Sequence, residues 1–105
     1  MNYYKCELGK YQHESSHVWS YVTQMINQDF NKIICQRISS LRKKHNITLE
    51  QLAYQSGISK GGLSEIERNM KEPRAYTILK ICNGLGISMK EFFDFPDLDK
   101  FSENL

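Results

Sequence analysis

One helix face near the middle of the chain gathers most of the side chains that could do chemistry. A helix that begins at residue 60 turns by about 100° per residue, so its residues separate into two faces. The polar face comprises Lys60, Gly61, Ser64, Glu65 and Arg68. The opposite face carries Leu63 and Ile66, which predicts that this helix packs on a core and exposes its polar side.

The residue types on this polar face match the donors and acceptors of base edges in DNA. Lysine donates to guanine O6 and N7, glutamate accepts from cytosine N4, and serine does either. Gly61 has no side chain and lets the backbone come close to a partner. An ordinary solvated face carries the same residue types, so the face by itself leaves both interpretations open.

Two consecutive glycines, Gly61 and Gly62, stand at the start of this helix. Each costs roughly 1 kcal/mol of helix stability relative to alanine. Close approach to DNA, close approach to the preceding helix and a soft recognition helix are three explanations, and all three stay open at this point.

One repeated pattern predicts where three helices begin. In residues 47–52, 58–63 and 87–92, a hydroxyl residue suited to N-capping follows an isoleucine and precedes an apolar residue at the fourth helical position. Thr48 with Gln51, and Ser88 with Glu91, also fit the capping box. The pattern predicts helices that begin near residues 49, 60 and 89.

The first two of these helices lie very close together in the sequence. Gly57 stands where the first should end, because glycine tolerates the left-handed conformation of a helix C-terminus, and Asn69 can end the second in the same way. Only Ile58 and Ser59 then separate the two helices. So tight a turn predicts a helix-turn-helix crossing.

Apolar spacing predicts the remaining helices. A helix that ends in the basic stretch 42–45 carries Ile33, Ile34, Ile38 and Leu41. After Pro73, a helix that Gly84 or Gly86 ends carries Tyr76, Ile78, Leu79, Cys82 and Leu85. A fifth helix runs from Ser88 towards Phe93, and Pro96 is expected to end the ordered core.

An extension precedes these five helices. Apolar residues at helical spacing predict a helix from about residue 16 to 29, which either ends there or runs on into the next: Val18, Val22, Met25, Ile26 and Phe30. Its apolar stripe suits two roles, covering the core or making a dimer contact. Residues 1–15 show no clear period.

Charge is concentrated in the middle of the chain, although the formal net charge is only +2. Residues 32–74 carry nine basic and four acidic residues, whereas both flanks are acidic. Concentrated positive charge is typical of a phosphate-binding face. No apolar run is long enough to cross a bilayer and no secretory signal is evident, so we expect a cytoplasmic protein without a membrane partner.

The cysteines and histidines indicate neither a disulfide framework nor an enzyme. Cys6, Cys35 and Cys82 are odd in number and widely spaced, which favours reduced thiols. A zinc site from Cys6, His13, His17 and Cys35 lacks the usual paired cysteines. No catalytic triad, paired carboxylate or nucleotide-binding loop is visible, and we expect no cofactor and no metal.

Residues 33–93 resemble the phage-repressor and Cro-like (XRE-type) helix-turn-helix domain. The matching stretches are ITLEQLA (47–53), SGIS (56–59), LSEIERN (63–69), Pro73 and LGIS (85–88). The resemblance implies an all-α, five-helix lambda-repressor-like DNA-binding domain over residues 31–95, with the N-terminal helical extension over 1–30 and an acidic, loose tail over 96–105. It also implies a sequence-specific transcriptional regulator that binds double-stranded DNA, as a homodimer on a near-palindromic site.

The resemblance assigns roles to individual residues. Base contacts are implied for Ser59, Lys60, Gly61 and Glu65, to which the polar face adds Ser64. Phosphate contacts are implied for Arg42, Thr48, Arg68, Lys71 and Arg74. Glu67 matches a glutamate that pairs with the basic residue at position 42, and Ala53 matches a small residue that lets two helices cross closely.

Three positions depart from the family pattern. Leu49 replaces a polar residue, commonly glutamine, that touches phosphate; Gly62 replaces a larger side chain; and Asn69 replaces a glycine. The change at Leu49 and the paired glycines favour an alternative function, a protein-interaction or antitoxin-like module in which DNA binding is secondary.

Overall fold

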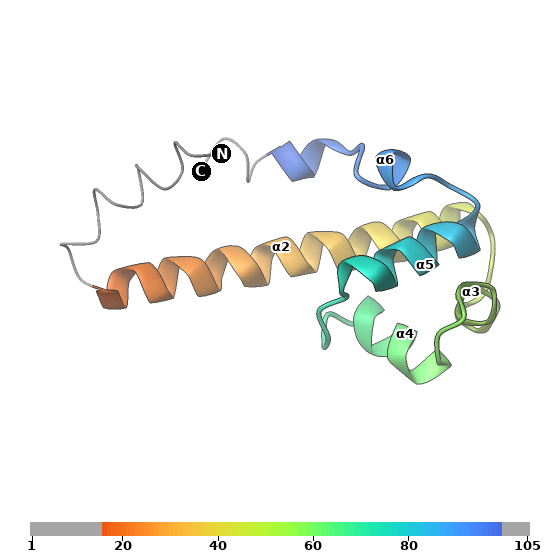
Figure 1. Cartoon of the computed structure of the whole chain (residues 1–105), viewed down its shortest axis with the longest axis horizontal. Helices are drawn as coiled ribbons and strands as arrows, with labels where there is room; N and C mark the ends of the chain where they lie inside the picture. The colour runs from red at the N-terminus through yellow and green to blue at the C-terminus, as the bar shows by residue number, and fades with distance from the viewer. Residues whose placement is uncertain (1–15, 100–105) are drawn as a thin grey trace.

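The computed structural model describes residues 16–99, apart from the side chains of residues 16–17, 23–25 and 27. Five α-helices and one short 3-10 helix follow one another (Figure 1): α2 (Ser16–Lys44), α3 (Leu49–Ser56), α4 (Lys60–Glu67), α5 (Ala75–Leu85), α6 (Met89–Phe92) and η1 (Pro96–Leu98). The all-helical fold class is confirmed. None of the described helices is both long and apolar enough to cross a membrane.

The helix starts predicted at residues 49, 60 and 89 are confirmed, and so are their caps. Thr48 accepts a hydrogen bond from the N–H of Gln51, whose side chain returns one to the N–H of Thr48, so the capping box is complete. Ser59 caps α4 through the N–H of Gly62, and Ser88 caps α6 through the N–H of Glu91. Local hydrogen bonding therefore sets where each helix begins.

The predicted helix ends also hold. Gly57 (φ 69°) and Gly86 (φ 73°) end α3 and α5 in the left-handed conformation, and Asn69 (φ 58°) adopts it just after α4. Asn46 (φ 60°) does the same after α2, which ends at Lys44 within the predicted basic stretch 42–45. Asparagine tolerates this region better than other residues with a side chain.

The extension and the first core helix form one continuous helix, α2, so the expected boundary at residues 30/31 falls inside it. Its 29 residues span about 43 Å, and the other helices gather around its C-terminal half (Figure 1). None of the described side chains in residues 18–33 is buried, whereas Ile34, Cys35, Ile38 and Leu41 are. The first half of α2 therefore projects beyond the core.

The core lies between the C-terminal half of α2 and helices α3 to α6. Its largest fully buried side chains are Ile38, Leu52, Leu63, Ile81 and Phe92, with Cys35 and Cys82. Leu49 packs partly buried against this core, as do Ile47, Ile58 and Ile87, the residues before or at the helix starts.

The close packing of α3 against α5 depends on Gly84, which the sequence reading considered only as a helix end. A Cβ at Gly84 would meet the Ser56 hydroxyl and would lie 3.1 Å from the Ser56 nitrogen and 3.2 Å from the Gln55 carbonyl carbon. Backbone atoms of α3 cannot move aside as a flexible side chain can. Gly84 is thus a small residue that this helix contact needs. Ala53, the small residue expected on α3, is buried in the core.

The ordered core extends beyond Pro96, contrary to expectation. Pro96 begins η1, and Leu98 packs partly buried against the core. Arg37 on α2 holds the chain just before this segment. It donates to the carbonyls of Phe92 (2.8 Å) and Glu91 (2.9 Å), and its guanidinium lies 5.0 Å from the centre of the Phe95 ring. Residues 100–105 of the expected tail, like residues 1–15, lie outside the described part of the chain.

The same change, glycine to alanine, should have opposite effects on stability at two positions. Gly84→Ala should lower the free energy of unfolding by about 1–3 kcal/mol, because the added methyl overpacks the α3–α5 contact. Gly61→Ala is the matched control: nothing lies within 4 Å of its added Cβ, so it should raise stability by up to about 1 kcal/mol through helix propensity. Urea denaturation of the two variants tests this; a stable Gly84→Ala protein would contradict the packing role.

Candidate nucleic-acid interface

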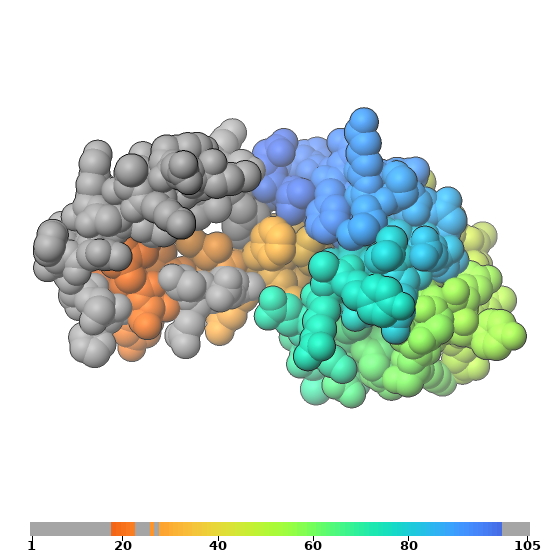
Figure 2. All heavy atoms as spheres, in the orientation of Figure 1, coloured from red at the N-terminus to blue at the C-terminus, as the bar shows by residue number. Residues whose placement is uncertain are grey.

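Helix α4 has the two faces expected from its sequence. Leu63 and Ile66 are buried in the core, whereas Lys60, Gly61 and Glu65 are exposed and Ser64 is half-buried. In the space-filling view, α4 lies at the lower edge of the molecule (Figure 2), on the side away from α6 and η1. The polar face of α4 predicted from the sequence, which we call the reading face, is therefore an exposed surface of the described structure.

The turn between α3 and α4 sets the direction of this face. The N–H of Gly57 donates to the carbonyl of Tyr54, and the N–H of Ile58 donates to that of Ala53. Both bonds satisfy carbonyls at the end of α3, and Ser59 then caps α4 directly. Only Gly57, Ile58 and Ser59 lie between the two helices, and each takes part in the turn or the cap. The turn therefore fixes the direction of the outward face of α4 relative to α3.

The paired glycines have different environments. A Cβ at Gly61 would have open space around it, so close approach to the preceding helix does not explain this residue. A Cβ at Gly62 would lie 2.9 Å from the hydroxyl oxygen of Ser59, the atom that accepts the cap hydrogen bond. Gly62 therefore leaves the N-cap of α4 undisturbed, and Gly61 presents bare backbone to solvent.

Lys60 pairs with an acidic residue on the other helix of the motif. Its Nζ lies 2.7 Å from Oε1 of Glu50, and both side chains are largely exposed, at 61% and 71%. The hydrogen bond and positive charge of Lys60 lower the pKa of the Glu50 carboxyl below its ordinary value. Glu50 was not among the residues singled out from the sequence, because ten positions separate the two partners along the chain.

A second ion pair, between Arg42 and Glu67, is nearly buried, at 16% and 10% side-chain exposure. The guanidinium donates to both carboxylate oxygens, at 2.7 and 3.0 Å, and to the carbonyl of Ile47 at 3.0 Å. This pair joins the end of α2 to the end of α4, as the family resemblance implied. Two of the five guanidinium hydrogens remain for a phosphate contact, which stays a prediction for Arg42.

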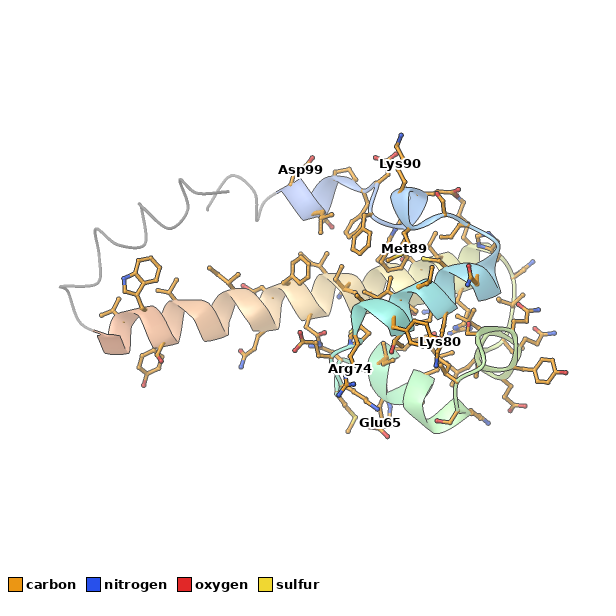
Figure 3. All side chains as sticks on the ribbon, in the orientation of Figure 1. Glu65, Arg74, Lys80, Met89, Lys90 and Asp99 are labelled. Atoms are coloured by element: carbon orange, nitrogen blue, oxygen red, sulfur yellow. The ribbon has the colours of Figure 1, made fainter. Side chains whose placement is uncertain are left out.

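The other residues expected to contact phosphates lie around α4. Arg68, Lys71 and Arg74 are exposed, and Figure 3 shows Arg74 and Glu65 on the lower side of the molecule, opposite Lys90 and Asp99. Thr48 uses its hydroxyl oxygen as an acceptor in the cap of α3, so its hydroxyl hydrogen stays available. Lys71 and Arg74 line one pocket together with Ser59 and Gly62 at the start of α4.

Two contacts from α2 hold the segment that follows α4. Asn31 Nδ2 donates to Oδ1 of Asn69 at 2.7 Å, and the Cys35 thiol points to the carbonyl of Lys71 with a distance of 3.9 Å. Asn69, where the family pattern has glycine, thus gains a partner on α2. No local pattern could have identified Asn31, because the two asparagines are 38 residues apart.

Nothing in the described residues forms a site for a metal: no three histidine, cysteine, aspartate or glutamate side chains gather there. Cys35 and Cys82 are buried free thiols. Burial raises the pKa of Cys35 to about 11 and also raises that of Cys82, so both stay protonated and poorly nucleophilic near neutral pH. Of the zinc ligands considered from the sequence, Cys6, His13 and the side chain of His17 lie outside the described part.

Comparison with known proteins agrees with this geometry. Residues 38–92 match the profile of the helix-turn-helix family. The HTH-type transcriptional regulator SutR of Escherichia coli is 30% identical over 66% of this chain and 39% of its own length. An uncharacterized HTH-type transcriptional regulator, y4dJ of Sinorhizobium fredii, is also 30% identical, over 70% of this chain and 95% of its own length.

Solved structures show the same fold. The wild-type restriction-modification controller protein C.Esp1396I is 30% identical, with a TM-score of 0.59 over 61% of this chain and 82% of its own. The controller C.AhdI from Aeromonas hydrophila is 28% identical, with the same TM-score over 62% of this chain and 98% of its own. From these matches and the two-helix motif at its surface, the chain belongs to the XRE-type helix-turn-helix family of DNA-binding transcriptional regulators.

Proposed function

We propose that this protein binds double-stranded DNA sequence-specifically by inserting α4 into the major groove. The observation that carries the proposal is the division of α4 into a buried apolar face and an exposed face of polar groups. The major groove admits an α-helix and presents a distinct pattern of donors and acceptors for each base pair. Among the described residues, no group of three or more histidine, cysteine, aspartate or glutamate side chains could hold a metal at this face.

Three side chains and one stretch of backbone would read the bases. Lys60 would donate to guanine, Glu65 would accept from cytosine N4, and Ser64 could do either. Gly61 would let the start of α4 come close to the groove, since no side chain projects there. Ser59, which caps α4, stands at the same end and completes the set.

The phosphate contacts would hold the protein in register without reading sequence. Arg68, Lys71 and Arg74 flank α4 and carry positive charge to its outer side. Thr48 would donate its free hydroxyl hydrogen. Arg42 would act mainly by positioning, since its bonds to Glu67 and Ile47 hold the end of α4 against α2, and would reach a phosphate with the hydrogens that these bonds leave.

We also propose that the protein binds a near-palindromic site as a homodimer. Dimers of such motifs bind half-sites about one helical turn, roughly 34 Å, apart. The projecting half of α2 offers the contact surface, because Val18 and Tyr21 expose 56% and 70% of their areas although both are large and hydrophobic. Of the two roles that the apolar stripe suits, the dimer contact is the one we propose.

Selection of binding sites from a random duplex library tests which residues contact bases and which contact only phosphates. Lys60→Ala or Glu65→Ala should change the selected sequence while most affinity for mixed DNA is kept. Lys71→Ala, the matched control, should keep the selected sequence and weaken binding to all duplexes. If wild-type protein bound no duplex even at low salt, the protein-interaction alternative would replace DNA binding.

Sedimentation of the full chain tests the dimer. Val18→Asp combined with Tyr21→Asp should convert the dimer to a monomer, because two buried carboxylates would oppose the contact. Tyr76→Asp, a change at a tyrosine 67% exposed on α5, is the control and should leave the dimer intact. Unchanged sedimentation of the double variant would exclude α2 as the interface.

A further inference from the structure

The pair between Glu50 and Lys60 is the one described ion pair that spans the two helices of the motif on its exposed side. Glu50 is the second residue of α3, and Lys60 is the first residue of α4. Two residues before Glu50 stands Thr48, an expected phosphate contact. The carboxylate therefore lies at the edge of the surface that would meet DNA.

Folding does not require this pair. An exposed ion pair contributes little to stability, because water and salt screen it and two long side chains must be ordered. Both helix starts already have complete caps, at Thr48 and Ser59, and the buried Arg42–Glu67 pair holds α4 in place. The role of Glu50 therefore concerns how Lys60 binds a partner rather than how the chain folds.

A carboxylate at this position opposes general attraction to DNA. It repels the phosphate backbone, and it neutralises the nearest ammonium, so Lys60 counts less among the charges that neutralise phosphates. Of the other three acidic residues in the basic segment 32–74, Glu67 is neutralised by Arg42 in the core, Glu65 lies on the reading face and Glu72 lies in the loop before α5. Glu50 alone of the four pairs with a base-reading residue.

We propose that Glu50 is a specificity-determining residue, which suppresses non-specific DNA binding by holding Lys60 away from the phosphates. The inference rests on the proposed function. On an arbitrary sequence, Lys60 would only exchange one anion for another and leave Glu50 facing the backbone. On a matching sequence, the ammonium keeps its bond to Glu50 and donates its two other hydrogens to guanine O6 and N7, a contact that only the correct base pair offers.

Fluorescence anisotropy with two duplexes of equal length tests this: one selected by the wild-type protein from a random library, and one of mixed genomic sequence. Glu50→Gln should bind the mixed duplex about three- to tenfold more tightly at 50 mM salt, with a salt slope steeper by about 0.9, the value for one added phosphate contact. The ratio of selected to mixed affinity should fall by a similar factor.

Two comparisons separate this effect from net charge. Asp94→Asn makes the same charge change at an exposed residue that follows α6, a helix that lies on the side of the molecule away from α4 (Figure 1). It should leave the slope and the ratio unchanged. In a Lys60→Gln background, Glu50→Gln should change binding to mixed DNA much less, because most of its effect passes through Lys60. Glu50→Ala repeats the measurement if the glutamine variant shows a lowered Tm.

Several results would overturn the inference. An unchanged salt slope for Glu50→Gln would do so, as would an equal rise in affinity for both duplexes. An undiminished effect in the Lys60→Gln background would show that the carboxylate acts on DNA directly. If the wild-type protein showed no salt-dependent binding to any duplex, the proposed function would fail first and this inference with it.

Discussion

Burial of Leu63 and Ile66 determines which side of α4 faces outward, and the reading surface depends on it. The two side chains lie on one side of a helix of eight residues, so their place in the core leaves Lys60, Gly61 and Glu65 on the other side. The turn at Gly57 and the cap at Ser59 fix where this helix begins. A change that let α4 rotate by one residue would move every candidate base contact by about 100°.

The two ion pairs of the motif have equal shortest distances, 2.7 Å, and different physical consequences. Arg42 and Glu67 are nearly buried, and their bidentate geometry joins α2 to the end of α4. Lys60 and Glu50 are exposed, so their pairing contributes little to the stability of the fold. Burial, rather than distance, separates an interaction that positions the motif from one that modulates its outer charge.

Local chemistry explains why much of this fold could be predicted from sequence. Caps at Thr48, Ser59 and Ser88 and the left-handed ends at Gly57 and Asn69 act within a few residues, so a pattern reveals them. Gly84 was assigned only as a possible helix end, because its packing role depends on the backbone of α3, nearly thirty positions away. Leu98 and Arg37 were missed for the same reason: their contacts join distant parts of the chain.

The candidate site also contains residues that a local sequence pattern reveals and residues that it does not. The candidate base-contacting residues were identifiable because they share one helix face, whereas Glu50 and Asn31 contact partners on other elements.

Binding of α4 in the major groove is most directly tested with modified bases in a selected duplex. Replacing its guanines by 7-deazaguanine removes the N7 acceptor of the major groove, and replacing them by inosine removes the N2 amino group of the minor groove. If α4 binds in the major groove, 7-deazaguanine should weaken binding and inosine should leave it nearly unchanged; the opposite pattern would contradict this placement of α4.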